Sequence, residues 1–113
     1  MTITFKGFGM LAYENKKGKK VFVKITKHAE NKFVERYNKV NGHIIDLKET
    51  YDLMQSFFSN SNKVKNLNRF EKKRLLKYGK DTQFFRTNFF TFIIKNATLI
   101  TVEISDKGKR YLN

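Results

Sequence analysis

The sequence lacks cysteine, proline and tryptophan, and it contains few acidic residues. Without cysteine the chain has no disulfide, no thiolate zinc site and no cysteine nucleophile, which fits a reducing compartment. Without proline, and with only six glycines among 113 residues, it shows no linker and no low-complexity tail. We therefore expect a single domain over residues 1–113, long enough to bury a hydrophobic core without covalent cross-links.

Long apolar runs are missing as well. No stretch approaches the roughly 18 apolar residues that a bilayer-spanning helix needs. The first residues, Met1 to Lys6, lack the basic and apolar regions of a secretory signal peptide. We therefore expect no membrane partner, and we expect the protein in the cytoplasm of the producing cell or of an infected host.

Charge is the strongest compositional signal, because 24 Lys and Arg residues stand against 10 Asp and Glu residues, a formal net charge of +14. An AT-rich genome would enrich Lys, Asn, Phe, Ile and Tyr, and codon bias therefore offers one explanation. However, Asp and Glu codons tolerate AT richness comparably, and these residues remain scarce. The surplus of cations therefore predicts a polyanionic partner, most simply nucleic acid.

The first half of the chain predicts a β-hairpin followed by two helices. Residues 10–13 and 21–25 are apolar runs on either side of a basic turn at 15–19. Thr26 can cap a helix that starts at Lys27 and ends near Gly42. This helix has an apolar stripe of Ala29, Phe33, Tyr37 and Val40. A second helix is predicted from Asp46, where Asp46 and Glu49 form a capping-box pattern before a stripe of Leu47, Tyr51, Met54 and Phe58.

The second half predicts a loop, a short helix and a hairpin. Residues 59–68 are polar and rich in asparagine, which indicates a loop, and residues 69–78 can form a short basic helix packed through Phe70, Leu75 and Leu76. Residues 89–94 and 99–104 flank the turn Asn96-Ala97, so that Phe92 would lie opposite Thr101 and Phe90 opposite Glu103. The predicted fold class is α+β, a small antiparallel sheet with two to three helices packed on it.

One segment concentrates groups that can act on phosphate. On a helix, His28, Lys32, Glu35 and Arg36 share a stripe opposite the apolar one. Imidazole can transfer a proton near neutral pH, and ammonium and guanidinium groups can hold phosphate charge. A solvated helix face with ordinary charge pairs would have the same pattern.

The string Thr26-x-His28-Ala29-x-x-Lys32-x-x-Glu35-Arg36 resembles the S/T-x-H-A-x-x-R-x-x-E-R signature of small phage and plasmid proteins. Those proteins are similar in fold to RelE-like toxins and to the wider barnase-like ribonuclease group. Lys32 departs from the signature, because it keeps the charge but loses the bidentate geometry of arginine. The resemblance spans about residues 20–105 and implies a RelE-like fold.

The same resemblance implies RNA binding or metal-independent RNA cleavage, with no cofactor. It implies that His28 is the general acid or base and that Arg36 and Arg86 hold phosphate. Lys95 and Thr101 would support them from the sheet, and Glu35 would orient Arg36. The two histidines, His28 and His43, have no patterned carboxylates near them in the sequence, so we expect no metal site.

Further basic residues fall in clusters, each of which alone would fit a solvated turn. Together they offer several contacts to phosphate, and nearby aromatic residues (Phe70, Tyr78, Tyr111 and the pair Phe84-Phe85) offer surfaces for stacking on bases. The candidate nucleic-acid-binding residues are Lys32, Lys16, Lys17, Lys19, Lys20, Arg69, Lys72, Lys73, Arg74, Lys77, Lys109 and Arg110.

Three functions remain open from the sequence. The first is a ribonuclease of toxin type with an acidic antitoxin as partner. The second is a non-catalytic phage or mobile-element inhibitor that binds a host defence complex or its guide RNA. The third is an accessory protein that associates with RNA or with the ribosome. We expect RNA rather than DNA as the partner, as the resemblance implies. A DNA-reading helix-turn-helix is disfavoured as well, because both well-defined helices are expected to pack on a sheet.

Overall fold

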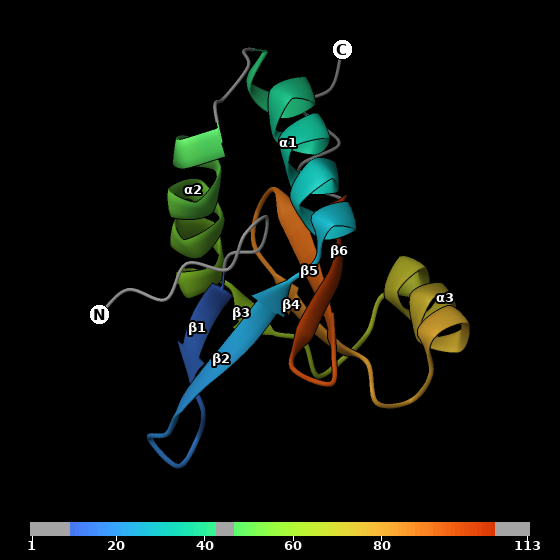
Figure 1. Cartoon of the computed structure of the whole chain (residues 1–113). Coiled ribbons are helices and arrows are strands. Elements are labelled where there is room, and N and C mark those ends of the chain that lie inside the picture. The colour runs from blue at the N-terminus through green and yellow to red at the C-terminus, as the bar shows by residue number, and fades with distance from the viewer. Residues whose placement is uncertain (1–9, 43–46, 106–113) are drawn as a thin grey trace.

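The computed structural model describes residues 10–42 and 47–105, and this part of the chain forms one sheet and three helices (Figure 1). The fold is α+β, which confirms the class predicted from the sequence. The elements are β1 (Met10–Glu14), β2 (Lys20–Ile25), α1 (Lys27–Asn41), α2 (Leu47–Ser59), β3 (Asn62–Lys63), α3 (Arg69–Tyr78), β4 (Gln83–Arg86), β5 (Phe90–Lys95) and β6 (Thr98–Ile104).

The sheet has six strands in the order β1-β2-β6-β5-β4-β3. It is mixed rather than wholly antiparallel as expected, because β2 and β6 pair in parallel through Lys24 with Thr98 and Ile25 with Leu99. A parallel pair needs a long crossover connection, and here the chain from α1 to β5 provides it. The sheet is also strongly curled, since Tyr13 of β1 lies 5.1 Å from Phe85 of β4 between ring centroids although the two strands are not neighbours.

Helix α1 forms as its sequence predicts. The hydroxyl oxygen of the N-cap Thr26 accepts a hydrogen bond from the amide of Ala29 at 3.0 Å, and Gly42 ends the helix in the left-handed conformation at φ 73°. Ala29, Phe33 and Tyr37 are buried. Their ring contacts reach β5, since the Phe33 centroid lies 5.4 Å from that of Phe90.

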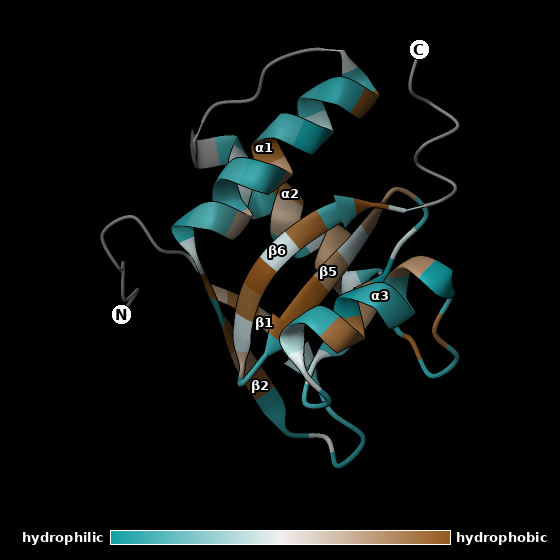
Figure 2. Cartoon of the chain, turned by 90° about the vertical axis from the view of Figure 1, so that its right-hand side faces the viewer, coloured by the Kyte–Doolittle hydropathy of each residue, from teal (hydrophilic) through white to brown (hydrophobic). Residues whose placement is uncertain are grey.

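Helix α2 lies beside α1 and covers the same face of the sheet (Figures 1 and 2). Met54 and Phe58 are buried, and Tyr51 is partly buried. Asp46, the expected cap of this helix, and His43 lie outside the described residues. Among the described helices, none combines the length and the apolar character needed to cross a bilayer.

Helix α3 stands apart from the other two helices (Figure 1) and spans the predicted residues. Its N-cap is Asn68, which forms a capping box with Glu71. Leu76, expected to pack, is 87% exposed. Leu76 does not pack because it lies on the outward side of the helix with Arg69, Lys72, Lys73 and Lys77, which are all exposed.

The β5–β6 hairpin departs from the predicted register after two pairs. Lys95 pairs with Thr98 and Ile94 with Leu99, as predicted, but Ile93 then pairs with Thr101, so Ile100 is an extra residue in β6. The expected pairs of Phe92 with Thr101 and Phe90 with Glu103 are therefore wrong. Because side chains alternate between faces, this bulge places Val102 with the phenylalanines in the core and moves Glu103 to the opposite face.

The remaining difference concerns two short strands. The segment 59–68, predicted as a loop, contains β3, which pairs with β4 through Asn62 with Arg86 and Lys63 with Phe85. Phe84 and Phe85 of β4 are 2% and 5% exposed, so they belong to the interior and offer no stacking surface.

Candidate nucleic-acid interface

Arg36 forms an ion pair with Glu103, which the bulge in β6 places on the sheet face opposite the core. The Nη2 atom of Arg36 donates to both carboxylate oxygens of Glu103 at 3.5 Å, and the side chains are each 18% exposed. Arg74 of α3 approaches the same carboxylate, with Nη2 3.9 Å from Oε2. Glu35, expected to orient Arg36, instead pairs with Lys32 at 3.5 Å. Glu103 thus holds Arg36.

Arg86 is held by a different carboxylate. Its Nε donates to Oε2 of Glu71 at 3.0 Å, and its Nη2 donates to Oε1 of the same group. Glu71 is 0% exposed, and its Oε1 also accepts a hydrogen bond from the amide of Asn68 at 2.9 Å. A buried carboxylate with a bidentate arginine and a backbone donor is well compensated. Arg86 is therefore fixed in place, with 37% of its side chain exposed.

These contacts attach α3 to the sheet at three points, one on each of three adjacent strands. Glu71 binds Arg86 of β4, Arg74 approaches Glu103 of β6, and the Tyr78 carbonyl accepts a hydrogen bond from Lys95 of β5. Lys95, expected to help hold phosphate, therefore binds α3. Thr101, expected as an accessible hydroxyl, is 2% exposed and lies in the interior.

His28 lies in the first turn of α1 and is exposed to solvent. Arg36 follows eight residues later, which corresponds to about 12 Å along a helix axis. His28 also lines none of the three described clefts. The structure thus brings Arg36 and Arg86 to one face of the sheet, and it leaves His28 on a separate part of the α1 surface.

The strongest concentration of positive charge is the segment from Asn60 to Lys80, which we call the cationic segment. It contains eight Lys and Arg residues and a single acid, Glu71. Because Glu71 is buried, every exposed charged side chain of the segment is positive. The exposed cations are Lys63, Lys65, Arg69, Lys72, Lys73, Lys77 and Lys80, with Arg74 half-buried beside them.

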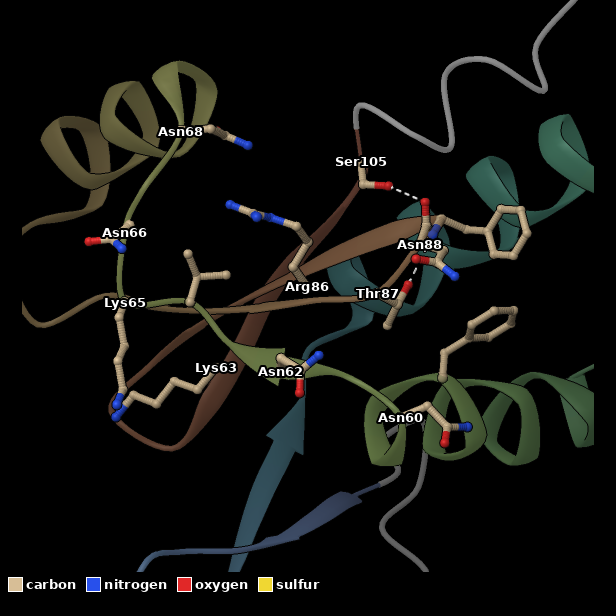
Figure 3. Close-up of a pocket in the computed structure, with 13 residues that line it drawn as sticks. Asn60, Asn62, Lys63, Lys65, Asn66, Asn68, Arg86, Thr87, Asn88 and Ser105 are labelled. Carbon is tan, nitrogen blue, oxygen red and sulfur yellow. Dashed lines mark hydrogen bonds between the residues drawn. The ribbon is translucent and has the colours of Figure 1, made fainter.

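A cleft of about 940 Å³ opens beside this segment, and we call it the amide cleft (Figure 3). Its walls come from the end of α2, from β3 and the chain that leads to α3, and from the β4–β5 turn. No Asp or Glu is found among its described lining residues, which are Phe57, Asn60, Asn62, Lys63, Val64, Lys65, Asn66, Asn68, Arg86, Thr87, Asn88, Phe89 and Ser105.

A second cleft of about 1320 Å³, the hairpin cleft, shares Asn62 and Lys63 with the first. Its other walls include the β1–β2 turn, where Lys16, Lys17 and Lys20 line it, and the acid Glu14. Lys19 is exposed in the same turn. The two clefts therefore meet at β3, and lysines occur along both of them.

Several predicted interface residues thus gather here, and others do not. Of the predicted cations, Lys16, Lys17 and Lys20 line the hairpin cleft and those of α3 are part of the cationic segment, whereas Lys32 pairs with Glu35 on α1. Lys109 and Arg110 lie outside the described residues, as does Tyr111. Sequence reasoning missed the amides of the cleft, although the asparagine-rich run that was assigned to a loop was a visible signal for them. Among residues 10–42 and 47–105, no three His, Asp or Glu side chains gather in a way that could hold a metal ion.

Comparison with known proteins gives no match: no family model, curated protein or solved structure is significantly similar to the chain.

Proposed function

We propose that this protein binds RNA through the cationic segment, together with the lysines of the β1–β2 turn. The observation that carries the proposal is the burial of Glu71, which leaves a run of 21 residues with exposed charges of one sign only. Clustered cations attract the phosphate backbone and release its counterions, and this term supplies most of the affinity of non-specific nucleic-acid binding.

The outward face of α3 supports the proposal further. Arg69, Lys72, Lys73 and Lys77 are exposed on it, and an isolated helix face of like charges is unfavourable for folding by itself. The charge is therefore retained at a cost that phosphate binding would offset. The guanidinium carbon of Arg74 lies 4.7 Å from the centroid of the Phe70 ring, so these two side chains of α3 already contact each other. We assign the contacts with phosphate to the outward lysines and Arg69.

RNA is the favoured polymer because the adjoining clefts are lined by amides and hydroxyls, which suit unpaired nucleotides. Folded RNA presents such nucleotides in loops, bulges and ends. Binding is the core of this proposal, and cleavage is a separate activity that the variant His28→Ala tests.

A charge-reversal pair tests the proposal. Lys73→Glu on α3 and Lys39→Glu on α1 each change the net charge by the same amount, and both lysines are exposed on helices. Binding of a fluorescently labelled RNA is measured by anisotropy at about 0.1 M salt. We expect Lys73→Glu to weaken binding about tenfold and Lys39→Glu to change it less than about twofold. Equal losses in both variants, or no binding by the unaltered protein at micromolar concentration, would overturn the proposal.

A further inference from the structure

The amide cleft has a chemical composition that the cationic segment alone does not explain. Three cations, Lys63, Lys65 and Arg86, line it together with five asparagines. Two of the asparagines are engaged, since Asn68 caps α3 and Asn60 donates to the Ser56 carbonyl at 3.0 Å. The side chains of the other three, Asn62, Asn66 and Asn88, make no hydrogen bond within the described residues. Each amide offers both a donor and an acceptor.

The lysines lie on one side of the cleft, whereas amides occur along its whole length. In Figure 3 the side chains of Lys63 and Lys65 converge on the left of the view, below α3 and on the same side as Asn66, whereas Thr87, Asn88 and Asn60 lie on the right, toward α2. Two lysines on one side of the cleft supply positive charge that attracts an anion. One end of the cleft therefore suits a phosphate, and the other end suits a neutral polar group that can exchange hydrogen bonds with amides.

Two aromatic rings border the cleft on the side toward α2. Phe57 and Phe89 are half-buried, with ring centroids 6.2 Å apart and an interplanar angle of 83°. Each ring therefore keeps part of its surface open toward the cleft that both residues line. Such rings provide stacking surfaces for planar bases, and stacking tolerates any base because every base has a π-face.

Together these features match a nucleotide with its base unpaired. We infer that the amide cleft holds one unpaired nucleotide of the bound strand, with its phosphate near Lys63 and Lys65 and its base between the amides and the half-buried rings. The volume of about 940 Å³ lies within the range of roughly 300–1,000 Å³ found for small-molecule sites. A base inside a duplex is paired and stacked on both faces, so it cannot enter the cleft.

This inference rests on the proposed function, and it adds a preference for single strands. The test compares a labelled RNA of about 12 nucleotides without self-complementarity and the same RNA annealed to its complement, at one salt concentration. We expect the single strand to bind about tenfold tighter than the duplex. Equal affinities would overturn the inference and leave the proposed function standing, whereas absence of binding to both forms would refute the proposed function itself.

Variants locate the preference in the cleft. Asn62→Ala combined with Asn88→Ala removes two amides that make no internal hydrogen bond, so the fold loses little. We expect the double variant to lose about tenfold in affinity for the single strand and less than about twofold for the duplex. Asn31→Ala, at an exposed asparagine of α1, is the matched control and is expected to change neither. An unchanged single-strand affinity in the double variant would overturn the inference.

A measurement on the unaltered protein is independent of any folding defect in the variants. In an NMR titration with the single strand, the side-chain amide resonances of Asn62 and Asn88 are expected to shift, while those of Asn31 stay in place. Shifts confined to the lysines of α3 would overturn the inference. Matched single-stranded DNA, bound as tightly as RNA and with the same shifts, would support the nucleotide subsite and correct the polymer named in the proposed function.

Discussion

Glu71 and Arg86 lie 15 residues apart in the chain and are joined in the fold by two hydrogen bonds. This pair anchors the N-terminal end of α3 to β4, and it hides the single acid of the cationic segment. The same contact therefore contributes both to the stability of α3 and to the uniform sign of the charge around it.

Breaking this pair from one side should destabilise the protein. Arg86→Gln leaves a carboxylate with 0% exposure without its cation, and we expect a loss of about 2–4 kcal/mol in the free energy of unfolding, measured by urea denaturation. The double variant Glu71→Gln/Arg86→Gln should recover part of that loss because no charge remains buried. A cost below about 1 kcal/mol for Arg86→Gln would contradict the structural role of the pair. If an Arg86 variant loses RNA binding or cleavage, the loss can therefore be interpreted only when the free energy of unfolding of that variant is measured as well.

The salt dependence of RNA binding should report the cations of α3 individually. For single strands, the logarithm of the binding constant falls with the logarithm of salt concentration by about 0.7 for each phosphate neutralised. Lys73→Gln should reduce this slope by about 0.7, whereas Lys39→Gln on α1 should leave it unchanged. Slopes that are identical in both variants and the unaltered protein would show that Lys73 contacts no phosphate.

Removing His28 should separate binding from cleavage. Because His28 is exposed in the first turn of α1 and lines neither the amide cleft nor the hairpin cleft, we expect His28→Ala to bind RNA within about twofold of the unaltered protein. Anisotropy measures this. A tenfold loss would instead place His28 in the interface.

The cleavage assay uses the same variant. The resemblance of residues 26–36 to the phage and plasmid signature implies that RNA is cut with EDTA present and that His28→Ala abolishes cutting. RNA left intact by the purified protein would contradict this role and favour a binding protein without turnover.

The turn of the β5–β6 hairpin contains a correctable strain. Asn96 and Ala97 both have positive φ, 52° and 55°, as a tight hairpin requires. Alanine in this region pays a steric cost that glycine avoids, so Ala97→Gly should raise the free energy of unfolding by about 0.5–1 kcal/mol. The control is Ala12→Gly in β1, which should lower it by a similar amount because strand interiors disfavour glycine. Urea denaturation decides, and a destabilised Ala97→Gly variant would contradict the assigned turn.

Local signals in the sequence predicted much of this fold. Thr26, Gly42 and the spacing of Ala29, Phe33 and Tyr37 were sufficient for α1, because capping and amphipathic periodicity act within a few residues. The bounds of α3 were predicted too, although the pattern Asn68-x-x-Glu71 that fixes its start was not used.

The features that define the candidate interface depend on contacts between distant segments. Ile100 looks like any other apolar strand residue, and only the packing of Phe90 and Phe92 against Val102 favours the bulge that places Glu103 beside Arg36. Asn62 and Lys63 have little strand propensity of their own, and they pair because β4 offers a free edge. The amide cleft follows from that pairing, so the asparagine-rich run indicated the amides but not the cleft that they line.

Strand β3 also forms one edge of the sheet, and it is only two residues long. Edge strands expose unpaired backbone groups on which another molecule can aggregate, and short length and lysine are common protections against this. Lys63 thus has a second effect at the sheet border, where its charge keeps separate copies from joining. Replacing it with an apolar residue would be expected to lower solubility in addition to any loss of RNA affinity, so glutamine or arginine is the better substitution at this position.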